Sequence, residues 1–162
     1  MITKIKNNVF QLSFQKFGSC VYLIRIKKDY ILIDTSSKAN EKELLKDLKE
    51  GKVRPENISI IILTHNHWDH TGNLALFTNA EIYDAKNIEK MPVKELKTIK
   101  TPGHTQDSLC FLYKDILFSG DTIFHNGGRG RTDLPGGSEE EILKSIEKLS
   151  KIKYDILCPG HV

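Results

Sequence analysis

The sequence predicts a layered domain of mixed helix and sheet, of the α/β or α+β class. Two helix patterns each carry apolar residues on one face, and short apolar strand patterns precede and follow both of them. This order favours helices that cover the faces of sheets. The 162 residues contain no repeat and no long linker rich in proline or glycine, so we expect one domain over residues 1–162.

The first half of the chain alternates strand, turn and helix patterns. The predicted elements are strands at residues 9–15, 20–27 and 30–34, a helix at residues 40–50 and a strand at residues 58–64. The helix has its leucines on one face and ends at Gly51. The strand "ISIIILT" is almost wholly apolar and rich in β-branched residues, which indicates burial on both faces.

The second half is dominated by strand patterns. We predict a short helix at residues 71–77, strands at residues 81–85, 96–103, 108–113, 115–120 and 154–160, and a helix at residues 138–151. The last helix begins with Ser138 and Glu141 in the spacing of a capping box, in which the serine accepts from a backbone N–H of the first turn.

Composition excludes several classes of protein. The chain is 39% hydrophobic and 28% charged, which is typical of a soluble globular domain, and a net charge of +3 gives no reason to expect a nucleic acid or an acidic membrane as partner. No apolar run is long enough to span a bilayer, and the first residues lack the apolar core of a secretory signal. Three dispersed cysteines in apolar runs favour core positions and a reducing cytoplasm.

Four polar residues stand just beyond the ends of apolar strands. They are His65 after residues 58–64, His104 after residues 96–103, Asp121 after residues 115–120 and His161 after residues 154–160. Strand ends are where a rigid sheet presents binding and catalytic groups. Three of the six histidines, with an aspartate, also crowd into "HNHWDH". Packing alone does not explain this pattern, whereas imidazole and carboxylate are good ligands for zinc and similar ions.

The spacing suggests how these ligands would divide between two ions. His65 and His67 are two positions apart and point the same way in extended backbone, so they can share one ion, which His104 completes. Asp69 and His70 follow a turn and can face a second ion. His161 would complete the second set, and the two oxygens of Asp121 could bridge the ions.

These motifs resemble the metallo-β-lactamase superfamily. "THNHWDH" is similar to its H-x-H-x-D-H signature, and "TPGHT", "SGDT" and "PGH" follow in the family's order, so that the resemblance covers about Val9 to His161. It implies a four-layer αββα sandwich with two divalent metals at one edge, zinc foremost and iron or manganese as alternatives. It assigns His65, His67 and His104 to one ion, Asp69, His70 and His161 to the other, and Asp121 between them.

The segment "GDTIFHNGGRGRTDLPGG" resembles compact glyoxalase II-like hydrolases and, through "GRTD", persulfide dioxygenases. It holds Arg129 and Arg131, two of only four arginines, which we expect to bind a substrate carboxylate through their planar guanidinium groups. A turn with solvated arginines is the alternative. Asp133 could anchor Arg131 or a metal-bound histidine. His125 matches no ligand of the family and is interpreted as a loop residue.

The leading functional hypothesis is hydrolysis of a small, acidic thioester by a hydroxide that two metal ions activate. Asp69 would orient the nucleophile while it binds metal, and Asp121 would bridge the ions. An iron-dependent persulfide dioxygenase, with Fe(II) on His65, His104 and Asp121, is the alternative. A nuclease and a non-catalytic metal-binding module are weaker ones. The chain has no room for the additional helical domain of glyoxalase II, which leaves glutathione specificity open.

Overall fold

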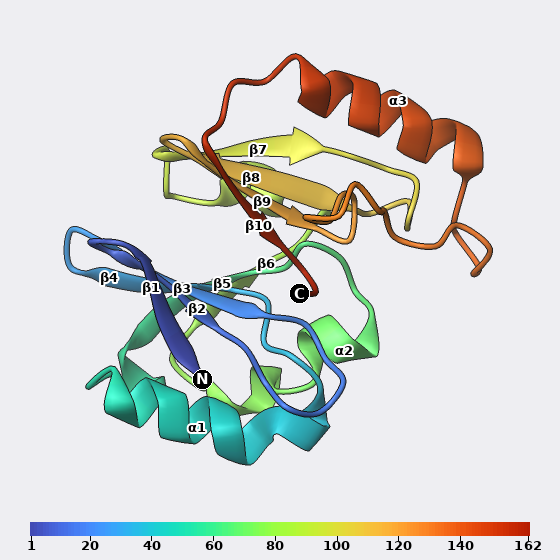
Figure 1. Cartoon of the computed structure of the whole chain (residues 1–162). Coiled ribbons are helices and arrows are strands. Elements are labelled where there is room, and N and C mark those ends of the chain that lie inside the picture. Colours follow the sequence, from blue (N-terminus) through green and yellow to red (C-terminus); the bar gives the residue numbers. More distant parts are fainter. The chain divides into compact units, whose positions relative to one another are not determined.

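The computed structural model describes all residues, Met1–Val162, and consists of two compact units, Met1–Tyr83 and Asp84–Val162 (Figure 1). Each unit contains one sheet and at least one helix. The prediction of one domain over residues 1–162 stays a prediction. No helix is long and apolar enough to cross a membrane.

The first unit contains a six-stranded sheet in which the strands lie side by side in the same order as in the chain. Its strands are β1 (Ile2–Lys6), β2 (Val9–Leu12), β3 (Val21–Ile26), β4 (Asp29–Ile33), β5 (Ile58–Ile62) and β6 (Glu81–Tyr83). The strands β1 to β4 form an antiparallel meander, whereas β4, β5 and β6 are mutually parallel neighbours. The carboxyl ends of β4 and β5 therefore meet at one edge of this sheet.

The helix α1 (Glu41–Glu50) covers one face of this sheet. Its Leu44 and Leu48 are fully buried in a cluster with alternate residues of the strands, among them Leu32 and Ile61. Truncating a leucine in such a position to alanine typically costs about 2–5 kcal/mol of stability. The strand β5 is buried on both faces, as its apolar run predicts, because Ile60 and Ile62 on the other face are buried too.

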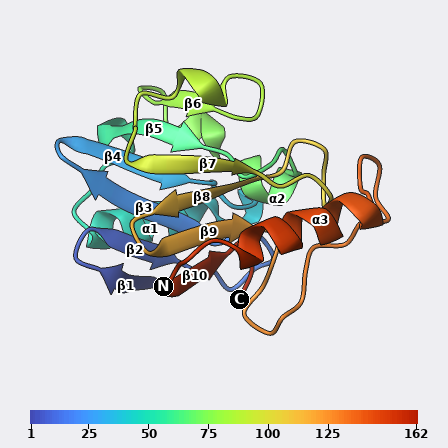
Figure 2. The ribbon, with the colours of Figure 1, turned by 90° about the horizontal axis from the view of Figure 1, so that it is seen from above.

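The second unit holds a four-stranded sheet in the order β10-β9-β8-β7 (Figure 2). Its strands are β7 (Leu96–Lys100), β8 (Leu109–Tyr113), β9 (Ile116–Gly120) and β10 (Ile156–Pro159). Both β7 and β9 are antiparallel to β8, and β10 is parallel to β9. The strands β7, β9 and β10 thus point the same way, and their carboxyl ends lie at one edge.

The helix α3 (Glu139–Ser150) packs on this second sheet. Ser138 caps it and accepts a hydrogen bond from the backbone N–H of Glu141 at 3.3 Å, as the sequence predicts. Leu149 is buried against Cys110 and Leu117. All three cysteines are buried and none forms a disulfide, and burial raises the pKa of the Cys110 thiol to about 11.

Two local predictions differ from the structure. The strand β1 was not expected, because its basic residues alternate with only two isoleucines and it lies at the edge of the sheet. The predicted short helix at residues 71–77 is instead one α-helical turn, α2 (Trp68–Thr71), followed by a 3₁₀ turn. The 3₁₀ segments are η1 (Lys38–Asn40), η2 (Pro55–Asn57), η3 (Leu74–Leu76) and η4 (Ile88–Lys90).

Candidate metal centre

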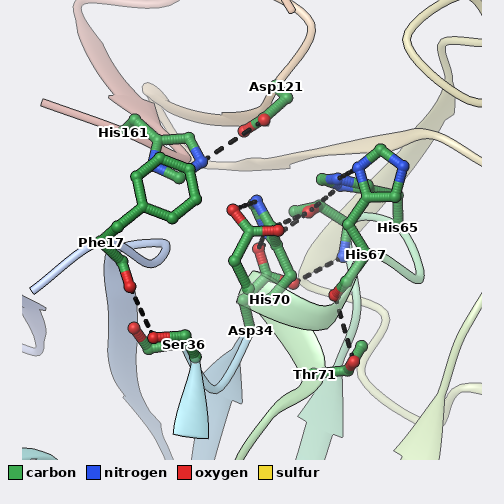
Figure 3. Close-up of polar contacts among 12 residues, drawn as sticks. Phe17, Asp34, Ser36, His65, His67, His70, Thr71, Asp121 and His161 are labelled. Carbon is green, nitrogen blue, oxygen red and sulfur yellow. Dashed lines mark hydrogen bonds and ion pairs between the residues drawn. The ribbon is translucent and has the colours of Figure 1, made fainter. Parts of the chain in front are cut away.

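The chain leaves β5 through Thr64 directly into the histidine-rich segment. His65 is buried and His67 is half-buried, and the His65 Nε2 and His67 Nδ1 atoms lie 3.1 Å apart (Figure 3). Two nitrogens that each bind one zinc ion at 2.0–2.1 Å in tetrahedral geometry are separated by about 3.3 Å. The separation of these two nitrogens is compatible with the binding of one ion, and that His65 and His67 share an ion stays a prediction.

The second pair belongs to α2. Asp69 and His70 are both buried, and the Asp69 Oδ2 and His70 Nε2 atoms are 4.0 Å apart. His70 Nδ1 lies 2.8 Å from Asp34 Oδ2 (Figure 3), so the ring donates through Nδ1 and keeps the lone pair on Nε2. Carboxylates and carbonyls commonly hold the second nitrogen of a metal-binding histidine in this way.

Asp34 is the residue that the sequence analysis missed. It follows β4, is buried, and adopts a left-handed backbone conformation with φ 60°. Its Oδ1 accepts from the Thr64 backbone N–H and its Oδ2 from the Thr64 hydroxyl, both at 2.8 Å. The Thr64 hydroxyl in turn lies 3.1 Å from His65 Nδ1. The signal was available, because Asp34 ends the apolar run "YILID" as the other candidates end theirs.

In the second unit two candidate histidines lie near one carboxylate oxygen of a third candidate, Asp121. Asp121 Oδ2 lies 3.6 Å from His104 Nε2 and 3.4 Å from His161 Nε2. Both distances exceed the usual hydrogen-bond range and suit ligands that share an ion. His104, Asp121 and His161 follow β7, β9 and β10, whose common direction brings their ends to one edge. A bridging role for Asp121 stays a prediction.

His104 is held by the segment rich in glycine and arginine. Its Nδ1 donates to the backbone carbonyl of Arg131 at 2.7 Å, which keeps the Nε2 lone pair toward Asp121. There is no room for a side chain at position 130 beside this hydrogen bond. A Cβ at Gly130 would lie 2.3 Å from the Asp121 carbonyl oxygen and 2.7 Å from His104 Nδ1. The segment thus positions His104 through a backbone carbonyl, and the side chains in the sequence gave no basis for predicting this contact.

The two arginines predicted to bind substrate are exposed or half-exposed and contact acidic side chains. Arg131 forms a two-point contact with Asp133, at 2.7 Å and 2.5 Å, and these hydrogen bonds hold the pKa of Asp133 at about 2. Arg129 contacts Glu139 and lowers its pKa. Asp133 therefore anchors Arg131, one of its two expected roles. Substrate binding by Arg129 and Arg131 stays a prediction. His125 is exposed in a loop.

Each unit thus brings its own candidate ligands together. The first unit groups His65 with His67 and Asp69 with His70, and the second groups His104, Asp121 and His161. Imidazole nitrogens and carboxylate oxygens are donors that suit zinc, iron or manganese, so the residues present fit divalent metal. That all seven form a single two-metal centre stays a prediction.

The fold, the motifs and the donor sets define a class of protein. The model of the metallo-beta-lactamase superfamily matches residues 16–90 and 81–161, which together span most of the chain. The chain belongs to the metallo-β-lactamase superfamily.

Several individual proteins are similar in sequence to this chain. Two proteins of Methanocaldococcus jannaschii described as "probable metallo-hydrolase" are 32% and 31% identical, over 81% and 94% of this chain and 70% and 92% of their own lengths. A hydroxyacylglutathione hydrolase of Enterobacter sp. is 31% identical over 73% of this chain. The chain spans only 52% of that hydrolase.

Solved structures confirm the fold. TTHA1623 in a di-iron-bound form is 22% identical and superposes with a TM-score of 0.79, covering 95% of this chain and 92% of its own. ETHE1 from Myxococcus xanthus is 23% identical, with a TM-score of 0.74 over 95% of this chain and 75% of its own. The predicted metallo-β-lactamase fold class is therefore correct.

Proposed function

We propose that this protein hydrolyses small, acidic thioesters at a centre of two divalent ions. The proposed ligands are His65, His67 and His104 for one ion, Asp69, His70 and His161 for the other, and Asp121 for both. The observation that carries the proposal is the orientation of the histidines: His65, His70 and His104 each direct Nδ1 to a protein acceptor, so Nε2 is the nitrogen that can bind metal.

The chain's own residues would divide the remaining work. Divalent ions supply a nucleophilic hydroxide near neutral pH and polarise a carbonyl group. Asp69 would orient the attacking oxygen, since its carboxylate is buried beside His70. Arg131 would bind the substrate carboxylate through its guanidinium group. A thiolate leaves without a strong general acid, so no further proton donor is required.

Two relatives support thioesters as the substrate class. One is the hydroxyacylglutathione hydrolase of Enterobacter sp., and the other is an atrochrysone carboxyl ACP thioesterase of Aspergillus fumigatus, which is 29% identical over 99% of this chain and 55% of its own length. Both are much longer than this chain, so their particular substrates do not transfer. We propose zinc as the native metal, with iron and manganese as alternatives; the structurally similar TTHA1623 was crystallised with two irons.

The test combines metal content with an activity panel. Protein purified without added metal should contain close to two equivalents of zinc and hydrolyse thioesters such as lactoylglutathione. His67→Ala should lose about one equivalent and at least 100-fold in kcat/KM. His125→Ala is the matched control, because that histidine is exposed in a loop, and it should behave as wild type.

Two results would overturn the proposal. The first is that thioesters are not hydrolysed while the iron-loaded protein consumes oxygen in the presence of glutathione persulfide. That result would establish the persulfide dioxygenase hypothesis instead. If His67→Ala binds as much metal as wild type, His67 is not a ligand, and the assignment of ligands to two ions is wrong.

A further inference from the structure

Two large aromatic side chains of the first unit are exposed beside the candidate ligands. Phe17 is 66% exposed and Trp68 is 65% exposed, and their ring centroids are 5.8 Å apart at an interplanar angle of 41°. Exposed aromatic rings that touch one another offer a rigid apolar surface on which a ligand can bind. Both rings are in mutual contact, so they form one apolar surface, here called the aromatic wall (Phe17 and Trp68).

Buried polar contacts fix the loop that carries Phe17. The Phe17 carbonyl accepts from the Ser37 hydroxyl at 2.5 Å, and the Lys16 carbonyl accepts from Asn40 Nδ2 at 3.0 Å (Figure 3 shows Phe17 beside this region). At Gly18 the backbone passes so close that a Cβ would lie 2.6 Å from the Ser36 hydroxyl oxygen. The loop is therefore held in place by the fold, and presenting the phenyl ring to a ligand costs little further ordering.

The aromatic wall adjoins the candidate metal ligands along the backbone. Trp68 stands between His67 and Asp69 in the chain and begins α2. The loop of Phe17 is tied to the same turn, because the Ser19 backbone N–H donates to the Asp69 carbonyl at 2.9 Å. A group bound on the wall is thus held next to the residues proposed to position the reacting carbonyl.

We propose that the aromatic wall binds the acyl group of the substrate and makes the enzyme selective for apolar acyl chains. This inference rests on the proposed thioester hydrolysis and adds its substrate preference. Apolar chains gain free energy in proportion to the surface that they bury, and the two rings offer such a surface on one side of the acyl chain. We assign an apolar acyl chain to the wall because the acidic part of the substrate is assigned to Arg131, and an apolar surface does not favour a carboxylate.

Trp68 supplies a binding signal that needs no turnover. It is the only tryptophan of the chain, so intrinsic fluorescence reports on the wall directly. The probes are the S-ethyl and S-hexyl thioethers of N-acetylcysteamine, in which the alkyl chain takes the place of the acyl group and cannot be hydrolysed. We expect the hexyl probe to shift the emission and to bind about tenfold more tightly than the ethyl probe, with the difference abolished in Phe17→Ala.

Kinetics test the same site with acetyl and hexanoyl thioesters of that thiol. The ratio of kcat/KM for hexanoyl over acetyl should fall about tenfold in Phe17→Ala and in Trp68→Ala, and Trp68→Phe should restore most of it. The control is Leu143→Ala, which removes another exposed apolar side chain, from α3, and should leave the ratio unchanged. Metal content, measured for every variant, separates loss of the wall from loss of a ligand.

Equal affinity for the ethyl and hexyl probes, or a chain-length preference that survives in both Phe17→Ala and Trp68→Ala, would overturn the inference. So would a preference that follows the length of the thiol instead of the acyl chain. Failure of the proposed function looks different: no thioester is hydrolysed, while the fluorescence titration still reports whether the wall binds an apolar chain.

Discussion

At the scale of single residues, the orientation of imidazole rings is set by groups that are not themselves ligands. The Thr64 hydroxyl lies within hydrogen-bonding distance of Nδ1 of His65, the Asp34 carboxylate of Nδ1 of His70, and the Arg131 carbonyl of Nδ1 of His104. Fixing the tautomer before metal arrives raises affinity, because no ring has to reorient or exchange a proton.

Gly130 tests this positioning directly. In Gly130→Ala the new Cβ would clash with the Asp121 carbonyl and His104 Nδ1, so the segment must move away from His104. We expect metal affinity to fall about 10–100-fold, measured by titration of zinc into metal-free protein. Gly127→Ala in the same segment is the control, since nothing lies within 4 Å of its added Cβ, although its φ of 74° should lower the melting temperature slightly. Equal loss of affinity in both variants would contradict the argument.

Arg131 has two separable functions in this scheme. Its carbonyl holds His104, and any residue at this position can supply that contact. Its guanidinium group, clamped by Asp133, is the part proposed to bind a carboxylate. Arg131→Lys should therefore raise KM for acidic thioesters about three- to tenfold, with metal content and KM for neutral thioesters unchanged. If KM for both substrate classes stays the same, the guanidinium group has no role in binding.

At the scale of elements, the apolar patterns predicted most strands and both long helices, because each element buries a face whose periodicity is visible in the sequence. The edge strand β1 buries little and left only a weak pattern. Four of the seven ligand candidates were identified by their place after apolar strands and the other three by the motif "HNHWDH", and metal binding by all seven stays a prediction. Asp34 also ends an apolar strand pattern, so its place was visible in the sequence. Its partners were not, because its hydrogen bonds to Thr64 depend on β4 and β5 being parallel neighbours, and local sequence does not show pairing across 30 residues of chain.

That pairing gives a prediction for Asp34→Asn. The strands β4 and β5 end side by side, so one carboxylate can accept from Thr64 and hold His70. An amide places an NH₂ group where an acceptor is needed, which would push the imidazole proton onto Nε2, the nitrogen proposed for metal. We expect about 10–100-fold weaker binding at one of two sites, measured by calorimetric titration.

The control for this variant is Asp29→Asn, at the opposite end of β4, where the carboxylate accepts only from the Ser59 hydroxyl at 3.2 Å. It should bind metal as wild type does. Asp34→Asn that fills both sites normally would show that the carboxylate stabilises the fold without orienting His70.

At the scale of the whole molecule, the two units use the same device. In each, a pair of parallel neighbouring strands ends in polar residues: β4 and β5 lead to Asp34 and His65, and β9 and β10 lead to Asp121 and His161. A sheet edge holds such residues rigidly, so each unit presents preformed donors. Neither unit alone contains the full set of seven proposed ligands, and each would contribute part of the proposed centre.

Metal binding should therefore stabilise both units at once. A ligand present at about 100 times its dissociation constant stabilises the folded state by about 2.7 kcal/mol, and a centre that draws on both units applies this to both. With zinc, amide hydrogen exchange measured by mass spectrometry should slow in residues 63–71 of the first unit and in residues 101–105 and 119–123 of the second. His67→Ala should lessen the protection in both units, although the substitution lies in only one. Protection confined to a single unit, or lost only in the unit that carries the substitution, would show that the two sets of ligands bind metal separately.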